Sequence, residues 1–224
     1  MSQYSITVEI ESTTLKTLLE GGYHLVLVRD MGEVGEIAAG NIIFATFPPT
    51  GPNKLSNTQT FYWEEEYAVY ATSNGFENGN RVSKGSNETE LQRGQTAIIE
   101  PADTIVSGSH DASKPLTVVN EWNSRAFIVV ACKGKNNEGE DTLTPHYISK
   151  VRVLGTESLL TPVQTFSCFF ALSAKTATMI DYSTTRHGHF EISGANECII
   201  GYDAQDGVPP ANQWMGIANV KKLN

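Results

Sequence analysis

The segment Arg186-His187-Gly188-His189-Phe190-Glu191 contains the residues best suited to catalysis or metal binding. Alternate side chains of a β-strand share a face, so His187, His189 and Glu191 would point the same way. The two imidazoles would lie about 7 Å apart at Cα and could reach one metal ion, whereas Glu191 lies about 13 Å from His187. A neighbouring strand would have to supply a third ligand, with these candidates: His146, Asp181 and Glu197. The alternative is a polar strand face in solvent.

We therefore predict no metal site and no cofactor, and keep His187 and His189 as the candidates for a metal if one binds. His187, His189 and Glu191 are the catalytic candidates, as an acid–base or metal-binding group. The sequence contains no Gly-x-Ser-x-Gly elbow for a nucleophilic serine. It also has no glycine-rich phosphate loop and no nicotinamide, flavin or haem signature.

Three adjacent carboxylates, Glu64-Glu65-Glu66, form the second candidate site, beside Trp63 and Tyr67. Alternation places Glu64 and Glu66 on one strand face and Trp63, Glu65 and Tyr67 on the other. The carboxylate pair Glu64 and Glu66 could do acid–base work or bind calcium. The alternative is an edge strand whose charges prevent pairing with another chain.

Aromatic side chains in or near turns form the third candidate site. Aromatic faces beside amide groups suit sugars, which stack their C–H faces and form hydrogen bonds at their edges. Most aromatic residues of a β-sandwich are nevertheless expected in its core. We take four as candidate ligand-binding residues: Trp214, Phe76, Trp63 and Tyr202.

Charge and composition argue against nucleic-acid and membrane partners and favour a cytoplasmic location. The net charge of −9 argues against binding to nucleic acid or to anionic membranes. No signal peptide and no apolar run of about 20 residues is visible, so we expect no transmembrane segment. The cysteines are widely spaced and lie in apolar sequence, which predicts reduced core thiols in a cytoplasmic protein: Cys132, Cys168 and Cys198.

Short apolar runs separated by turn residues predict an all-β protein, a sandwich or barrel. No helical pattern extends over ten residues, although leucines 15, 18 and 19 allow a short helix or turn. The polar stretch 133–141 is expected to be exposed, and 31–40 to be a loop. The predicted strands are 5–11, 23–28, 41–47, 59–70, 81–84, 89–100, 116–122, 125–132, 147–154, 163–172, 176–182, 187–192, 196–202 and a possible last strand in 213–223.

Similar segments recur about 100 residues apart and in the same order. Gln-Thr-Phe occurs at 59–61 and at 164–166, and the run 23–28 resembles 126–131. Weaker matches link Glu90-Leu91 with Glu191-Ile192 and Ile98-Ile99 with Ile199-Ile200. We therefore predict a tandem pair of similar β-sandwich modules, 1–110 and 111–224. The alternative is one large continuous sandwich or barrel.

Function is less constrained than the fold. The first hypothesis is a soluble, non-catalytic binding protein, lectin-like or cytolysin-like, that recognises a glycan, a lipid headgroup or a small ligand through loops or the cleft between modules. The second is an enzyme that acts on an apolar small molecule in a β-scaffold pocket through His187, His189 and Glu191. The third is a structural or self-assembling protein, and a homo-oligomer is possible in any case.

Overall fold

The computed structural model describes residues 3–33, 36–38, 41–101, 103–108, 110–111, 113–122, 126–135, 140–150, 157–182, 185–203 and 214–223. Within these ranges it contains one helix, α1 (Ser12–Glu20), and strands β1 to β16. The strands are β1 (Gln3–Ile10), β2 (Tyr23–Glu33), β3 (Glu36–Ala38), β4 (Ile43–Phe47), β5 (Thr58–Thr72), β6 (Thr89–Leu91), β7 (Thr96–Glu100), β8 (Asp103–Ser107), β9 (Leu116–Asn120), β10 (Phe127–Lys135), β11 (Asp141–Ile148), β12 (Glu157–Leu172), β13 (His187–Ile192), β14 (Glu197–Tyr202), β15 (Trp214–Ala218) and β16 (Val220–Leu223).

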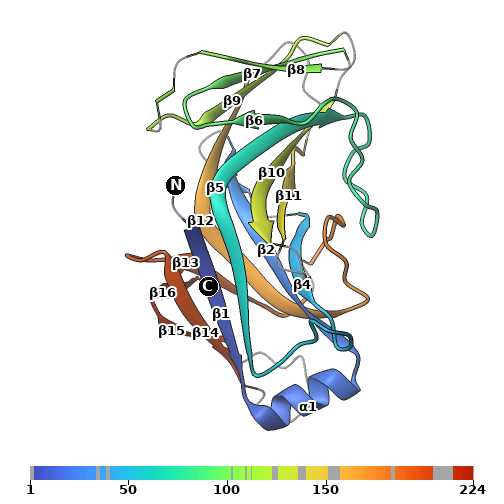
Figure 1. Ribbon diagram of the computed structural model, residues 1–224, viewed down its shortest axis with the longest axis vertical. Coiled ribbons are helices and arrows are strands. Elements are labelled where there is room, and N and C mark those ends of the chain that lie inside the picture. Colours follow the sequence, from blue (N-terminus) through green and yellow to red (C-terminus); the bar gives the residue numbers. More distant parts are fainter. Residues whose placement is uncertain are drawn as a thin grey trace.

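The strands form two mixed sheets that pack against each other, which confirms the predicted all-β sandwich. Sheet A has the order β11-β10-β5-β1-β14-β15, and β6 also pairs with β5. Sheet B has the order β16-β13-β12-β9-β7-β8, and β2 pairs with β12, β3 and β4. The long strands β5 and β12 run along the molecule, with β6 to β9 at one end and α1 at the other (Figure 1).

Each sheet combines strands from residues 1–110 with strands from 111–224. This sharing of both sheets is what the alternative of one continuous sandwich predicts. Whether the two ranges are modules of common origin, with a boundary at residue 110, stays a prediction.

The two sheets nevertheless match strand by strand. The hydrogen-bonded strands of sheet A follow the order β11-β10-β5-β1-β14-β15. If sheet B is followed from β12 through β2 and β4 instead of through β13 and β16, its order is β4-β2-β12-β9-β7-β8. Both contain one parallel pair at the same place, β1 with β14 and β9 with β7. Both have a side branch at the third strand, β6 on β5 and β13 on β12, while sheet B also carries β16 on β13 and β3 on β2. Wherever one half supplies a strand to sheet A, the other half supplies its counterpart to sheet B.

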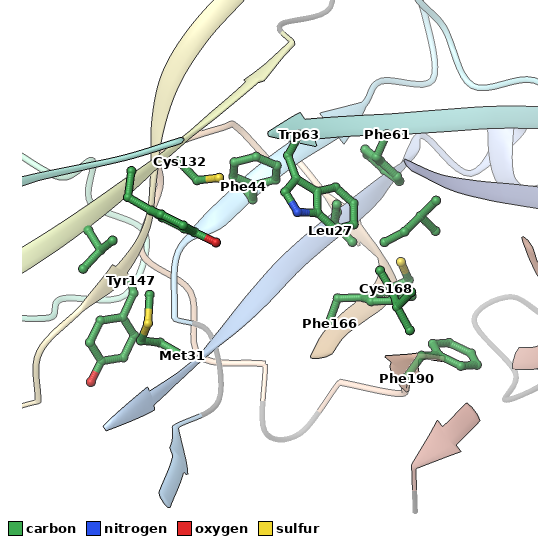
Figure 2. Packing of buried hydrophobic residues seen from close by; sticks show 14 of the residues in the cluster. Leu27, Met31, Phe44, Phe61, Trp63, Cys132, Tyr147, Phe166, Cys168 and Phe190 are labelled. Atoms are coloured by element: carbon green, nitrogen blue, oxygen red, sulfur yellow. The ribbon is translucent and has the colours of Figure 1, made fainter. Parts of the chain in front are cut away.

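Alternating burial explains how these strands make a core. On β5 the odd-numbered side chains Phe61, Trp63, Tyr67 and Val69 face the other sheet and belong to the main core cluster. The aromatic and sulfur-containing residues of this cluster come from both sheets (Figure 2). Ala68 and Tyr70 face outward into a smaller cluster over sheet A. A second outer cluster over sheet B contains Val26 and Phe169.

Some predicted strands are wrong because their apolar residues cover a sheet instead of pairing within it. Segments 81–84 and 176–182 meet only through isolated bridges, including Arg81 with Thr178. Val82 and Met179 from these segments pack on the outer cluster over sheet A. The predicted strand 89–100 is divided at Gly94, whose φ is +76°, and its two parts join different sheets. A Cβ at Gly94 would lie 2.1 Å from Asp111 O, so this turn requires glycine.

The remaining differences concern strand ends and two missed strands, β3 and β8. β2 runs through Glu33 into the predicted loop 31–40, which also contains β3. β11 begins at Asp141 inside the predicted polar stretch and ends at Ile148, so the predicted strand 147–154 does not continue into 149–150. The polar stretch is exposed as predicted at Glu140 and Asp141, but Lys133 is only partly exposed and Gly134 is buried; 136–139 lie outside the described residues. The short helix is confirmed; the Glu11 carboxylate accepts hydrogen bonds from the backbone N–H of Thr13 and Thr14 and so caps it.

Candidate functional site

A groove of about 1100 Å³ lies beside β5, β6, β10 and β11. Its lining combines carboxylates, cationic groups and a few apolar side chains. The residues are Glu65, Glu66, Tyr67, Glu88, Glu90, Leu91, Gln92, Arg93, Gln95, Val106, His110, Lys133, Asp141, Thr142 and Leu143. With five carboxylates against one lysine and one arginine, and with the histidine neutral, the formal charge of the lining is −3.

Lys133 of β10 is the centre of an ion network at this groove. Its Nζ lies 2.9 Å from Glu64 Oε2, 3.3 Å from Glu66 Oε2 and 3.9 Å from Asp141 Oδ2. Hydrogen bonds to Glu64 and Glu66 raise the pKa of Lys133 above its ordinary value, so the ammonium stays charged.

Glu64 and Glu66 therefore do share a strand face, as alternation predicted, but the ammonium of Lys133 lies on the same face. A general acid–base pair at Glu64 and Glu66 would have to work beside this ammonium, which already forms ion pairs with both carboxylates. The edge-strand alternative is wrong, because β5 lies between β10 and β1 in sheet A. The cationic partner, Lys133, lay in the stretch expected to be only exposed polar sequence.

The inner end of the groove joins sheet A to sheet B. Gln164 Nε2 of β12 donates to Glu65 Oε1 at 2.7 Å. Arg93 Nη2 donates to Pro162 O at 2.8 Å and lies 3.8 Å from Glu65 Oε1. These contacts fix Glu65 and Arg93, while Glu90, on the exposed side, has no ion-pair partner among the described residues.

The histidine strand 187–192 is found as predicted, as β13, and its three candidates have different partners. His189 Nε2 lies 2.8 Å from Asp30 Oδ2, and Asp30 is only 1% exposed. His187 Nδ1 donates to Thr185 O at 2.9 Å. Glu191 is exposed and lies 3.9 Å from Lys221 Nζ. Only His189 is oriented by a carboxylate, which is the arrangement found in acid–base dyads.

The suggested third metal ligands do not join this strand. His146 is fully buried on β11 in the other sheet, while Asp181 and Glu197 are exposed. In the described part of the chain, no three His, Cys, Asp or Glu side chains are grouped as a metal site requires.

Three of the four aromatic ligand candidates lie in the core. Trp63, Tyr202 and Trp214 are each 2% exposed, and the Trp214 ring stacks on Phe170 with centroids 5.5 Å apart. They offer no surface to a ligand in this structure. Phe76 is 41% exposed, and its role in ligand contact stays a prediction.

Sequence reasoning missed Asp30, Lys133 and Arg29. Asp30 and Arg29 follow the apolar run 23–28 directly, and continued alternation would have placed Asp30 on the face of Val26 and Val28. Lys133 similarly continues the strand that contains Val129 and Ala131. For Asp30 and Lys133, the sequence therefore contained a usable signal: each charged residue stands at the alternating positions whose side chains point outward from a buried strand.

The fold defines an all-β sandwich protein made of two mixed, interleaved sheets. Comparison with known protein families, with curated proteins and with solved structures found no match. None of the helical residues that the structure describes forms a segment long and apolar enough to cross a membrane.

Proposed function

We propose that this is a non-catalytic binding protein that holds a glycan in the groove beside β5, β6, β10 and β11. The observation that supports this most directly is the groove itself: its volume of about 1100 Å³ can hold a small oligosaccharide. Most of the residues that line it are polar, and most of them lie on strands of the sandwich.

The chemistry of the lining suits a neutral or basic sugar. Carboxylates such as Glu66 and Glu90 accept hydrogen bonds from sugar hydroxyls, and Gln92 both donates and accepts. Leu91, Val106 and Leu143 provide apolar surface for C–H faces. The formal charge of −3 disfavours acidic sugars and phosphate groups.

Compartment and assembly are part of the same proposal. Cys132, Cys168 and Cys198 are all buried free thiols, which supports a reducing, cytoplasmic location. Homo-oligomers are supported by Met215 and Ile217, which expose about half of their surface on β15.

A panel of immobilised neutral, basic and acidic glycans tests the proposal, with retained protein eluted by the free sugar. Glu90→Gln removes a groove carboxylate that has no ion-pair partner, and we expect a loss of affinity of about fivefold or more. Glu20→Gln makes the same change of charge on exposed α1 and should bind like the unchanged protein. Retention by no glycan, or equal binding by both variants, would refute the glycan proposal; release of dye from liposomes would instead favour a lipid headgroup.

The Asp30–His189 pair supports a second candidate function, an enzyme acting on an apolar small molecule. Asp30 is buried, and its Oδ2 lies 2.8 Å from His189 Nε2, which fixes this ring nitrogen. The His189 side chain remains 31% exposed. As general base, His189 would take a proton from a substrate at its other nitrogen. In an ester-hydrolysis screen, any turnover should be lost in His189→Gln and kept in His110→Gln; equal turnover in the two variants would exclude the site.

A further inference from the structure

Arg29 is a buried cation between the two sheets. It lies on β2, is 2% exposed, and its Cζ is 4.7 Å from the centre of the Trp63 ring and 5.6 Å from that of Phe44. Figure 2 shows these two rings beside Cys132, whose Sγ accepts a hydrogen bond of 2.9 Å from Arg29 Nη1. Among the described residues, no carboxylate forms an ion pair with Arg29.

Cys132 does not provide the missing negative charge. Burial raises the pKa of its thiol, although the charge of Arg29 acts in the opposite direction. Cys132 Sγ also lies 3.0 Å from Glu64 O and donates its proton there, as a thiol and not a thiolate would. The guanidinium is thus charged while its sulfur neighbour is neutral, and a buried charge without a counter-charge is strongly unfavourable.

The other polar groups around Arg29 still have hydrogen bonds to donate. The Tyr67 oxygen accepts a hydrogen bond from Arg29, which leaves its O–H proton free to donate elsewhere. The Trp63 indole nitrogen and both ring nitrogens of His146 are buried and have no hydrogen-bond partner in the described part of the chain. Burial raises the pKa of Tyr67, and burial together with the charge of Arg29 holds the pKa of His146 well below its ordinary value. Tyr67 therefore keeps its proton and His146 is neutral, so that each can donate one hydrogen bond.

We propose that this donor cluster, formed by Arg29, Tyr67, His146 and Trp63, binds a small monovalent inorganic anion of the halide class between the sheets. An anion would compensate the buried charge and could accept hydrogen bonds that these groups do not otherwise make. Since rings lie over the guanidinium, the anion approaches in its plane, which favours a small ion. Tyr67 also lines the groove, which gives the anion a route from solvent.

The proposal predicts stabilisation by chloride that ionic strength does not explain. The protein is dialysed into sodium gluconate, whose anion is too large for the cluster, and gluconate is then replaced by chloride or bromide at constant ionic strength. We expect Tm to rise with saturation, by about 5 to 10 °C at a hundredfold excess over the dissociation constant. Line broadening in chloride NMR reports the bound ion directly. No difference between chloride and gluconate would overturn the proposal and leave ordered water as the occupant.

Variants locate the site. Arg29→Met removes the charge while keeping most of the buried volume, and it should abolish the response to chloride. Arg93→Met is the matched control, because Arg93 already binds Glu65 and Pro162, and it should respond like the unchanged protein. Tyr67→Phe should weaken chloride binding about tenfold or more by removing one donor; this variant decides the question if Arg29→Met does not fold. A full chloride response in Arg29→Met, or unchanged affinity in Tyr67→Phe, would contradict the proposal.

Discussion

The outer faces of the two sheets carry opposite charge arrangements at matching places. On sheet A, Lys133 of β10 contacts several carboxylates, and it is partly exposed. On sheet B, Asp30 of β2 is buried and pairs with the imidazole of His189. A lysine among acids on one sheet thus corresponds to an acid beside an imidazole on the other.

The register of the strands shows that these places correspond. Arg29, which precedes Asp30, pairs with Phe166, and Phe166 pairs with Phe190 on the side branch β13. On sheet A, the residue before Lys133 is Cys132, which pairs with Tyr67, and Tyr67 pairs with Leu91 on the side branch β6. The same scaffold therefore supports two different sites, and they differ in the burial of their carboxylates: those around Lys133 are partly exposed and screened by solvent, whereas Asp30 is buried.

Removing the buried carboxylate tests this difference most strongly. Asp30→Ala should lower the free energy of unfolding by about 2 to 3 kcal/mol, because it leaves His189 without its partner and a gap in a closed site. Urea unfolding measures the change. Asp141→Ala is the control on the matching side, where the carboxylate is exposed and 3.9 Å from Lys133. Equal losses of stability in Asp30→Ala and Asp141→Ala would show that burial of the carboxylate does not make the two sites different.

The burial of His146 gives the second prediction. The pKa of His146 lies well below its ordinary value of 6.5, so as pH falls through 6.5 the unfolded chain takes up a proton that the folded protein does not. The free energy of unfolding should therefore decrease by about 1.4 kcal/mol per pH unit below pH 6.5 from this residue. His146→Phe should remove this part of the slope between pH 6.5 and 5, whereas His110→Gln, at an exposed site, should keep it. An unchanged slope in His146→Phe would contradict the assignment.

Lys133→Met should have the smallest effect on stability. Its network is partly exposed, so we expect a smaller loss than for Asp30→Ala, and one that depends on salt. Unfolding of the variant and of the unchanged protein should differ at low salt and converge at high salt. A difference that persists in high salt would indicate that the network is shielded from solvent, like the pair on sheet B.

The sequence predicted the elements far better than it predicted their partners. Alternation correctly assigned Glu64 and Glu66 to one face and Trp63 and Tyr67 to the other, because burial on one side of a strand leaves a period of two. It could not reveal that Lys133, about 70 positions away, lies over that face, since pairing between distant strands leaves no local signal. The same holds for Asp30 and His189.

Binding sites were harder to predict than the core because aromatic residues serve both to contact ligands and to fill the core. Trp63, Trp214 and Tyr202 lie near turn-rich sequence, as binding residues do, but in this protein they fill the space between the sheets. Composition around a residue predicts exposure of its backbone neighbours, not the direction of its own side chain. For Trp63, the alternating pattern was the more reliable guide, because it placed this side chain opposite the carboxylates of Glu64 and Glu66.

The pairing of β1 with β14 also determines when the protein can fold. Ser5 pairs with Glu197, so β1 must wait for its partner until about 190 further residues have been synthesised. At about 5 to 20 residues per second, synthesis of the intervening chain takes roughly 10 to 40 seconds. Throughout this time β1 lacks one neighbour and sheet A is incomplete, although β5 is already available. The nascent chain therefore presents an unpaired, apolar edge of β1 until β14 has been synthesised.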